Sequence, residues 1–246
     1  PRPAPSPSAN PSDDALRPAA SASEAWARPR RVTESHIVPP QWRADLREVL
    51  ITEPQIKRRV AELARAITRD YVGRDPVVVA LLTGTLMFLA DLLRRLVVPL
   101  KLDFIGVSSY REGTASRELV FTKDLRLEVA GRDVLIVDDI LDTGRTLKTV
   151  CARLERLKPG SLRTCVLLDK PSRRTEPVEA DYVGFVIPDL LVVGYGLDYA
   201  ERYRNLSFVG VLRPELYQAP PQATGLSPNT SQDSARSDLQ GGKQTT

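Results

Sequence analysis

The feature that most constrains the fold is an alternation of apolar runs with segments of helical periodicity. Residues 76–82 form a continuous apolar run, which is typical of a strand buried on both faces. Residues 52–71 before it open with a capping-box pattern and then repeat apolar residues at helical spacing. Further strands are predicted at 100–107, 134–137 and 163–168, and further helices at 86–96 and 147–157. This alternation predicts an α/β fold, a parallel twisted sheet flanked by helices.

The C-terminal third of the pattern contains shorter apolar pieces. Residues 182–187 and 191–193 are expected to form a small cap, or hood, over the end of the sheet. In sheets of this class, ligands bind at the carboxyl ends of the strands. That rule directs the search for a site to the residues that follow Leu82, Val137 and Leu168.

The two ends of the chain differ in composition from its middle. Residues 1–35 and 218–246 are rich in small and polar residues and poor in large apolar ones. Such segments bury too little apolar surface to offset the entropy lost on ordering, so we expect both tails to be disordered. The folded domain is therefore expected to be shorter than the chain.

Charge and composition argue against several classes of function. The net charge of +4 comes without long Lys or Arg tracts, so nucleic-acid binding is not expected. A single histidine, His36, argues against histidine-based catalysis or metal binding. The spacing of Cys151 and Cys165 matches no metal site, and we expect two core thiols. We find no membrane-spanning run and no signal-peptide pattern, and we expect a cytoplasmic protein.

One segment carries the strongest functional signal. Apolar residues 134–137 are followed by Asp138 and Asp139, then by a loop over residues 142–146 that leads into a helix. Backbone N–H groups and hydroxyls at a helix N-terminus form an anion site suited to a phosphate monoester. Gly144 lets the backbone approach that phosphate closely. The loop therefore predicts phosphate binding.

The paired acids suit a different part of the same ligand. Asp138 and Asp139 can accept hydrogen bonds from two vicinal hydroxyls, such as those of ribose. Two structural alternatives stay open: a strand that exits to water at these acids, and an ordinary helix N-cap at Asp142. Taken together, the segment favours a sugar-hydroxyl site beside a phosphate site.

Residues 134–147 resemble the signature with which type I phosphoribosyltransferases bind phosphoribosyl pyrophosphate (PRPP). Four more motifs narrow the resemblance to the hypoxanthine-guanine phosphoribosyltransferase family: Leu82-Thr83-Gly84-Thr85, Ser109-Tyr110, Asp169-Lys170-Pro171 and residues 192–199. The resemblance covers residues 45–217 and implies the type I phosphoribosyltransferase fold there. It also implies a purine salvage enzyme that transfers the phosphoribosyl group of PRPP to hypoxanthine or guanine, giving IMP or GMP and pyrophosphate.

The resemblance assigns roles around PRPP. Asp138 and Asp139 hold the ribose hydroxyls, and Asp142 is the general base near purine N7, a role worth about 10²–10⁴ in rate. The 5′-phosphate is held by Asp142, Thr143, Gly144, Arg145 and Thr146. Pyrophosphate is contacted by Thr83, Gly84 and Arg204, next to a peptide between Leu82 and Thr83 that is often cis. Mg²⁺ is the implied cofactor, with Asp198, Asp138 and Asp139 as candidate ligands.

The resemblance also implies a purine subsite. Lys170 donates to the 6-oxo group; an ammonium is only a donor, so it disfavours the amino group of adenine. Without the resemblance, Lys170 could equally be a solvated lysine at a strand end. Leu191, the Val192 carbonyl and Asp198 complete the subsite, and Ser109 and Tyr110 form a lid.

Two departures from the family pattern matter. Leu191 stands where many members have an aromatic residue, and Thr83 replaces a lysine found in some relatives. Leucine covers the ring by apolar contact but lacks the stacking geometry of an aromatic side chain. Competing hypotheses are a transferase for adenine, xanthine or a pyrimidine, and a non-catalytic regulator that binds nucleic acid. By analogy with the family, we expect a homodimer or homotetramer.

Overall fold

The structure is a computed structural model, and it describes residues 38–109 and 119–218. Tyr110 and, apart from Gln218, both tails expected to be disordered lie outside the described residues. Within these ranges, no helix is both long and apolar enough to cross a bilayer. The chain divides into two units, residues 1–213 and 214–246, and the described part of the second contains the 3₁₀ turn η4 (Pro214–Leu216).

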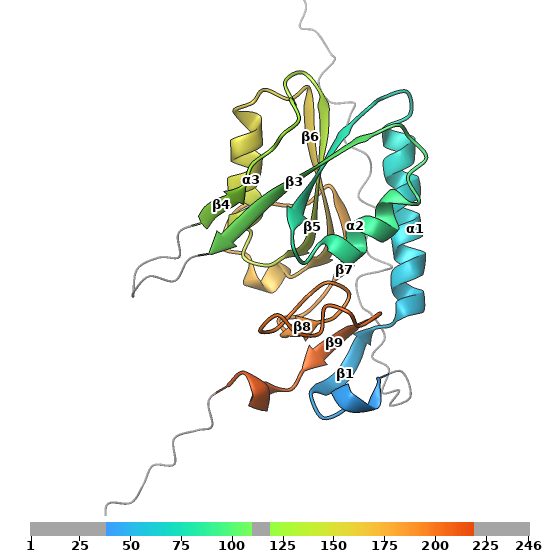
Figure 1. Ribbon diagram of the computed structural model, residues 1–246, viewed down its shortest axis with the longest axis vertical. Helices are drawn as coiled ribbons and strands as arrows, with labels where there is room; N and C mark the ends of the chain where they lie inside the picture. The colour runs from blue at the N-terminus through green and yellow to red at the C-terminus, as the bar shows by residue number, and fades with distance from the viewer. Residues whose placement is uncertain (1–37, 110–118, 219–246) are drawn as a thin grey trace, which may run out of the picture. The chain divides into compact units, whose positions relative to one another are not determined.

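A six-stranded sheet forms the centre of the first unit, in the order β4-β3-β2-β5-β6-β7 (Figure 1). The strands are β2 (Val77–Leu82), β3 (Lys101–Ser109), β4 (Leu119–Lys123), β5 (Asp133–Leu141), β6 (Ser161–Asp169) and β7 (Tyr182–Val186). Neighbouring strands from β3 to β7 run parallel, and β4 pairs antiparallel with β3 at the edge. The expected parallel sheet is confirmed, with one antiparallel edge strand added.

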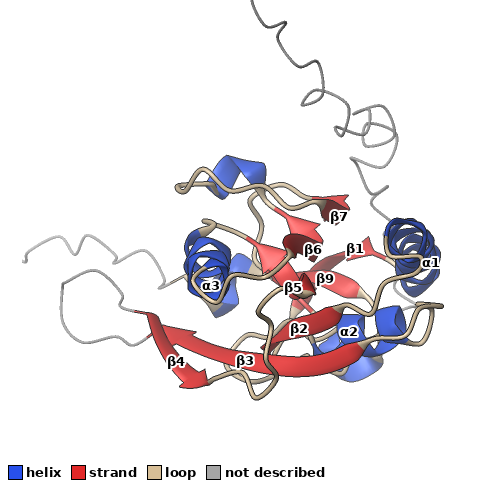
Figure 2. Cartoon of the chain, turned by 90° about the horizontal axis from the view of Figure 1, so that it is seen from above, coloured by secondary structure: helices blue, strands red, loops and turns tan. Residues whose placement is uncertain are grey.

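Helices cover both faces of this sheet. Figure 2 shows α1 (Glu53–Asp70) and α2 (Leu86–Leu93) on one face and α3 (Arg145–Glu155) on the other. Alternate residues of β2 divide between two cores: Val78 and Ala80 pack with the α1 and α2 side, and Val77 and Val79 with the α3 side. Burial on both faces explains why the sequence of β2 is continuously apolar rather than alternating.

Helix starts follow local sequence signals. The Thr52 N–H donates to Gln55 Oε1 at 2.8 Å, so the capping box before α1 is present. Helix α2 ends at Leu93, three residues before the predicted end. Pro99 follows shortly afterwards, and the residue before a proline disfavours helical geometry.

A second, three-stranded sheet forms the hood, in the order β1-β9-β8. It consists of β1 (Leu46–Ile51), β9 (Val209–Leu212) and β8 (Val192–Val193), and β9 pairs antiparallel with both neighbours. The assignment of residues 182–187 to the hood is wrong, because β7 pairs parallel with β6 in the main sheet. Strand β1 was not predicted, since its partner β9 lies far away in the sequence.

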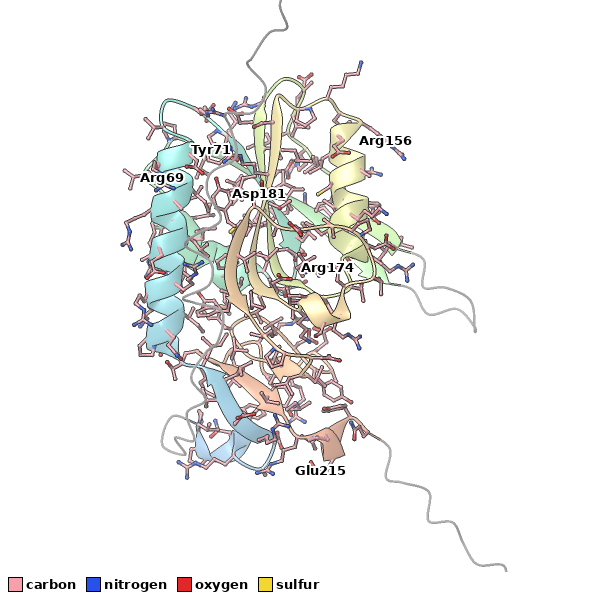
Figure 3. The ribbon with its side chains drawn as sticks, turned by 180° about the vertical axis from the view of Figure 1, so that it is seen from behind. Arg69, Tyr71, Arg156, Arg174, Asp181 and Glu215 are labelled. Atoms are coloured by element: carbon pink, nitrogen blue, oxygen red, sulfur yellow. The ribbon has the colours of Figure 1, made fainter. Side chains whose placement is uncertain are left out.

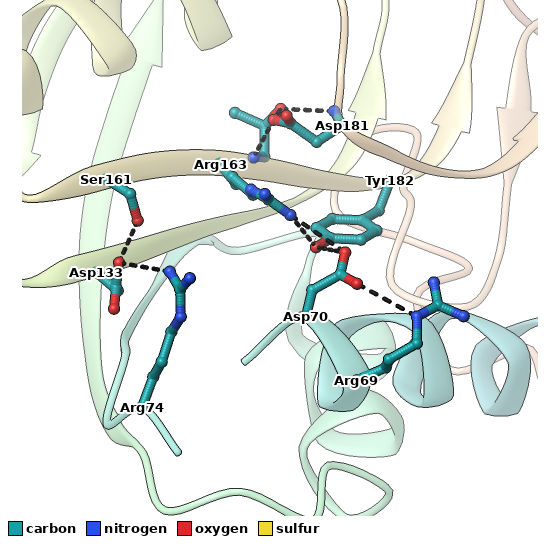
Figure 4. Close-up of polar contacts among 9 residues, drawn as sticks. Arg69, Asp70, Arg74, Asp133, Ser161, Arg163, Asp181 and Tyr182 are labelled. Atoms are coloured by element: carbon teal, nitrogen blue, oxygen red, sulfur yellow. Dashed lines mark hydrogen bonds and ion pairs between the residues drawn. The ribbon is translucent and has the colours of Figure 1, made fainter. Parts of the chain in front are cut away.

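A polar network lies at the end of the main sheet where its parallel strands begin (Figure 4). Arg163 donates to Asp70 and to the Tyr182 hydroxyl at 3.1 and 2.9 Å, and that hydroxyl donates to Asp70 at 2.8 Å. These bonds tie β6 and β7 to the C-terminus of α1. The network lies at the amino ends of the strands, away from the carboxyl ends where ligands are expected.

Candidate functional site

A cavity of about 390 Å³ lies at the carboxyl ends of β2 and β5. Its lining brings together three parts of the predicted site: Gly84, the acid pair Asp138 and Asp139, and the loop of residues 142–146. Arg173 also lines the cavity, although the sequence did not identify it as a site residue. Residues from separate motifs therefore meet in one space, as the strand-end rule predicts.

The acid pair lies inside β5 rather than after it. Pairing with β6 continues through Asp138 to Leu141, so the idea of a strand that exits to water at these acids is wrong. Asp138 is only 8% exposed; it accepts from the Asp139 N–H at 3.0 Å and from the Thr85 hydroxyl at 3.4 Å. Burial raises the pKa of Asp138 well above its usual range, and the nearby charge of Asp139 raises it further.

The second acid of the pair experiences the same desolvation. Burial raises the pKa of Asp139 as well, while the charge of Arg204 acts in the opposite direction. Two adjacent carboxyl groups with raised pKa values share a proton readily, because both cannot ionise cheaply in a low-dielectric site. Such a pair can both accept from and donate to the vicinal hydroxyls of a sugar.

Gly84 lies against the acid pair. A Cβ atom at this position would overlap the carboxylate of Asp139, so the strand end approaches the acid more closely than any other residue would allow. The peptide between Leu82 and Thr83 is cis, as the resemblance implied. Thr83 itself is exposed and does not contribute to the cavity lining.

The predicted phosphate loop, residues 142–146, leads directly into α3. The helix begins at Arg145, close to the predicted position, and Gly144 is its N-cap with a φ of 89°. The N-cap is Gly144, so the alternative reading of Asp142 as an N-cap is wrong, and the Thr143 hydroxyl accepts from the Arg145 N–H at 3.5 Å. The first N–H groups of a helix have no intrahelical partner, and here they lie at the cavity. This arrangement suits an anion.

Residues 174–176, which follow β6, form hydrogen bonds with the backbone of the phosphate loop. The N–H groups of Thr175 and Glu176 donate to the Thr143 carbonyl at 3.0 and 3.1 Å. Arg174 donates to the carbonyls of Leu141, at 3.0 Å, and of Asp142. Figure 3 shows Arg174 beside the 3₁₀ turn η3 (Pro171–Arg173) that follows β6. These bonds hold loop carbonyls away from the cavity.

The same guanidinium is anchored on β6. Arg174 forms an ion pair with Asp169, and both side chains are largely buried. Sequence reasoning missed Arg174, although its place four residues after Lys170 in a turn-forming Pro-Ser-Arg-Arg stretch was a signal. Through Arg174, this turn links the phosphate loop to β6.

Lys170 is buried at the end of β6, with 6% of its surface exposed, so the reading of a solvated lysine is wrong. Its N–H donates to the Leu141 carbonyl at 2.9 Å, which places its backbone beside the start of the phosphate loop. Burial lowers the pKa of the Lys170 ammonium, and the charges of Asp142 and Asp189 oppose that shift. Among the residues that the structure describes, none forms a hydrogen bond or ion pair with this ammonium.

The hood supplies a backbone acceptor. The Leu191 carbonyl accepts from the Leu212 N–H at 2.9 Å, so it points toward β9. Adjacent carbonyls of a strand point in opposite directions, and Val192 therefore directs its carbonyl to the open edge of β8. Leu191 is partly exposed, whereas the Val192 side chain is buried.

A loop of the hood packs against the cis-peptide segment. Arg204 forms an ion pair with Asp198 at 2.9 Å and donates to the Gly196 carbonyl at 2.9 Å. A Cβ atom at Gly196 would overlap the Gly84 carbonyl, so the two segments are in close contact. Asp198 and Arg204 lie outside the lining of the cavity, but the charge of Arg204 acts on Asp139.

No preformed metal centre exists in the described part of the chain. Within residues 38–109 and 119–218, no group of three His, Cys, Asp or Glu side chains could hold a metal ion. Asp138, Asp139 and Asp198 therefore do not form a joint cage. Mg²⁺ rarely needs one, because it usually binds one or two carboxylates together with substrate phosphates.

Comparison with known proteins identifies the family. Residues 49–200 match the model of the phosphoribosyl transferase domain. The chain belongs to the phosphoribosyltransferase family. A hypoxanthine-guanine phosphoribosyltransferase of Staphylococcus aureus is 49% identical over 174 residues, which cover 70% of this chain and 97% of the relative. A crystal structure of a hypoxanthine phosphoribosyltransferase from that organism has a TM-score of 0.70 and 47% identity, covering 74% of this chain and 100% of that one.

Other phosphoribosyltransferase relatives are parts of longer proteins. The bifunctional protein TilS/HprT of Listeria innocua is 50% identical over 174 residues, which are 70% of this chain but 27% of that protein. The match to these relatives is therefore limited to about a quarter of their length. The sequence-based assignment of this phosphoribosyltransferase to its family is confirmed.

Proposed function

We propose that this phosphoribosyltransferase transfers the 5-phosphoribosyl group of PRPP to N9 of hypoxanthine or guanine. The products are IMP or GMP and pyrophosphate, so the reaction is a purine salvage step. One observation carries the proposal: an acid pair, whose first member Asp138 is buried, and a loop at a helix N-terminus line the same cavity of about 390 Å³. The names of the relatives described above support the choice of purine.

Sugar and phosphate are held by two neighbouring elements. The N–H groups at the start of α3 and the hydroxyls of Thr143 and Thr146 bind the 5′-phosphate, and Arg145 adds positive charge nearby. Asp138 and Asp139, which precede this loop in β5, bind the ribose hydroxyls. Along the chain, the acids for the ribose hydroxyls come next to the loop for the 5′-phosphate, as the hydroxyls and the phosphate are neighbours in ribose 5-phosphate.

Glycosyl transfer to the purine requires a group on the enzyme that accepts the purine's proton. Asp142, at the first position of the phosphate loop, accepts the proton of N7 as N9 attacks C1′ of the ribose. The C1′–O bond to pyrophosphate breaks as the new bond forms, through an oxocarbenium-like state. Pyrophosphate leaves on the opposite face, toward Gly84 and Arg204, where Thr83 provides backbone contacts.

The residues present fit a Mg²⁺ ion that is shared with substrate oxygens. Asp138, Asp139 and Asp198 are the candidate carboxylates, one or two of which would hold it together with substrate phosphate oxygens. When bound, the ion would neutralise the charge that develops on departing pyrophosphate. Arg204, which forms an ion pair with Asp198, would add positive charge beside this candidate carboxylate.

Purine selection depends on Lys170 and the hood. An unpaired, buried ammonium favours an exocyclic carbonyl and leaves the amino group of adenine without an acceptor. The outward carbonyl of Val192 accepts from a purine N–H, and Leu191 covers the ring by apolar contact. We also propose that Asp198 contributes to this subsite.

The remaining expectations follow the family by analogy. We propose a domain over residues 45–217, a lid that begins at Ser109 and Tyr110, a cytoplasmic location, and a homodimer or homotetramer. Ser109 is the last residue of β3, whose strand end lies beside β2.

The proposal is tested by supplying PRPP and Mg²⁺ with each nucleobase in turn and measuring pyrophosphate release. We expect turnover with hypoxanthine and guanine, and much less with adenine or uracil. Turnover confined to adenine or a pyrimidine would contradict the assignment. Tight binding of duplex nucleic acid at physiological salt, without turnover of any base, would instead favour a regulator.

A further inference from the structure

Arg173 has a place in the site that the family resemblance left unassigned. It is the last residue of η3 and contributes to the lining of the cavity. Its Nε donates to Asp142 Oδ1 at 3.2 Å, and its Nη1 lies 3.7 Å from Asp189 Oδ2. The side chain is 47% exposed, so this contact is not a by-product of core packing.

Backbone bonds fix Arg173 relative to its neighbours. The Arg173 N–H donates to the Lys170 carbonyl at 3.1 Å, and the Lys170 N–H donates to the Leu141 carbonyl at 2.9 Å. Pro171 restricts the backbone at the start of the turn. These bonds hold the backbone of Arg173 and of Lys170 beside the start of the phosphate loop, and the Arg173 guanidinium reaches the Asp142 carboxylate there.

The two cations compete for the same two acids. Asp142 and Asp189, the carboxylates that face Arg173, are also those whose charges stabilise the ammonium of Lys170. A buried ammonium strongly favours a paired carboxylate, because it has lost most of its hydration. Yet Lys170 has no such partner among the described residues, while Arg173 binds Asp142.

We propose that Arg173 is a positioning residue that keeps Asp142 paired and thereby leaves the Lys170 ammonium unpaired for the 6-oxo group of the purine. The proposal rests on the proposed function. Because Nε contacts only one carboxylate oxygen, the other remains available to purine N7. A guanidinium suits this task, since it keeps its charge and cannot act as a competing proton acceptor.

Removal of Arg173 would change which cation pairs with Asp142. Asp142 would lose its nearest cation and would draw the ammonium of Lys170 toward itself. The purine would then have to break this ion pair before it could bind the ammonium, which weakens purine binding rather than PRPP binding. The phosphate loop keeps its own support, because Arg174 and the N–H groups of residues 175 and 176 hold it independently.

The test compares full-length wild type with Arg173→Met, Arg173→Lys and the control Arg69→Met. Arg69 is an exposed arginine in the last turn of α1, where it forms an ion pair with Asp70 beside the network at the amino ends of the strands (Figure 4). We expect Arg173→Met to raise the KM for hypoxanthine at least about tenfold. The KM for PRPP should change by less than about twofold, and Arg69→Met should match wild type.

Arg173→Lys separates charge pairing from a structural effect. A lysine at this position still offers a cation to Asp142, so we expect it to recover most of the hypoxanthine KM. An unchanged hypoxanthine KM in Arg173→Met, an equal rise in Arg173→Lys, or an equal rise in the KM for PRPP would each overturn the proposal. An inactive wild type would overturn the proposed function and this inference together.

Discussion

Gly144→Ala is the sharpest test of how tightly the phosphate loop is packed. Gly144 has a φ of 89°, a conformation that costs other residues roughly 1–2 kcal/mol. A Cβ atom there would lie 2.6 Å from Val178 Cγ1 and 3.1 Å from Arg174 Cδ. Overpacking of this kind costs about 1–3 kcal/mol. The substitution should therefore lower the free energy of unfolding by about 2–5 kcal/mol.

Gly73→Ala is the matched control. Gly73 has a φ of 73°, but a Cβ atom there would meet nothing within 4 Å. This variant should lose only the backbone contribution of roughly 1–2 kcal/mol. Urea unfolding of both variants gives the two free energies directly. The difference between them, about 1–3 kcal/mol, measures the packing of the loop against the segment that holds it.

The same substitution should affect substrate binding. The added methyl group pushes the loop away from Val178 and Arg174 and toward the cavity, which narrows the phosphate site. We expect the KM for PRPP to rise about tenfold or more in Gly144→Ala and to stay unchanged in Gly73→Ala. If Gly144→Ala loses no more stability than Gly73→Ala and keeps its KM for PRPP, the packing argument is refuted.

Two further predictions concern the acids of the site. Asp142→Asn should lower kcat at least about tenfold while PRPP binding, measured by calorimetry, persists; unchanged kcat would contradict the role of a general base. Because burial raises the pKa of Asp138, the folded state binds that proton more tightly than the unfolded state. Wild type should therefore lose stability as pH rises from the unfolded pKa through the folded one. Asp138→Asn has no such loss, so the Tm of this variant should rise relative to the Tm of wild type by a few degrees as pH increases above the unfolded pKa. A Tm difference that stays constant with pH would exclude this titration.

The features of the fold and of the candidate site depend on local sequence to different degrees. The acid pair and the predicted phosphate loop are contiguous in the chain, over residues 138–146, so one segment encodes both halves of the proposed sugar-phosphate site. The apolar run of β2 likewise indicates a buried parallel strand from its own composition. Such features were predictable because the interactions that define them lie within a few residues of one another.

Strand partners could not be assigned in the same way. Residues 182–186 joined the main sheet rather than the hood, and residues 46–51 became a hood strand by pairing with β9. A short apolar segment has the same periodicity in either sheet. The choice is made by packing against residues far away in the chain, which the local pattern does not contain.

The charges around the purine subsite were also decided by tertiary structure. The sequence determined that a phosphate loop, an acid pair and Lys170 are present, because each follows a predicted strand. Only the folded chain buries Lys170 and pairs Asp142 with Arg173, 31 residues away in sequence. Burial and pairing depend on which strand ends become neighbours, and that arrangement results from the packing of the whole sheet.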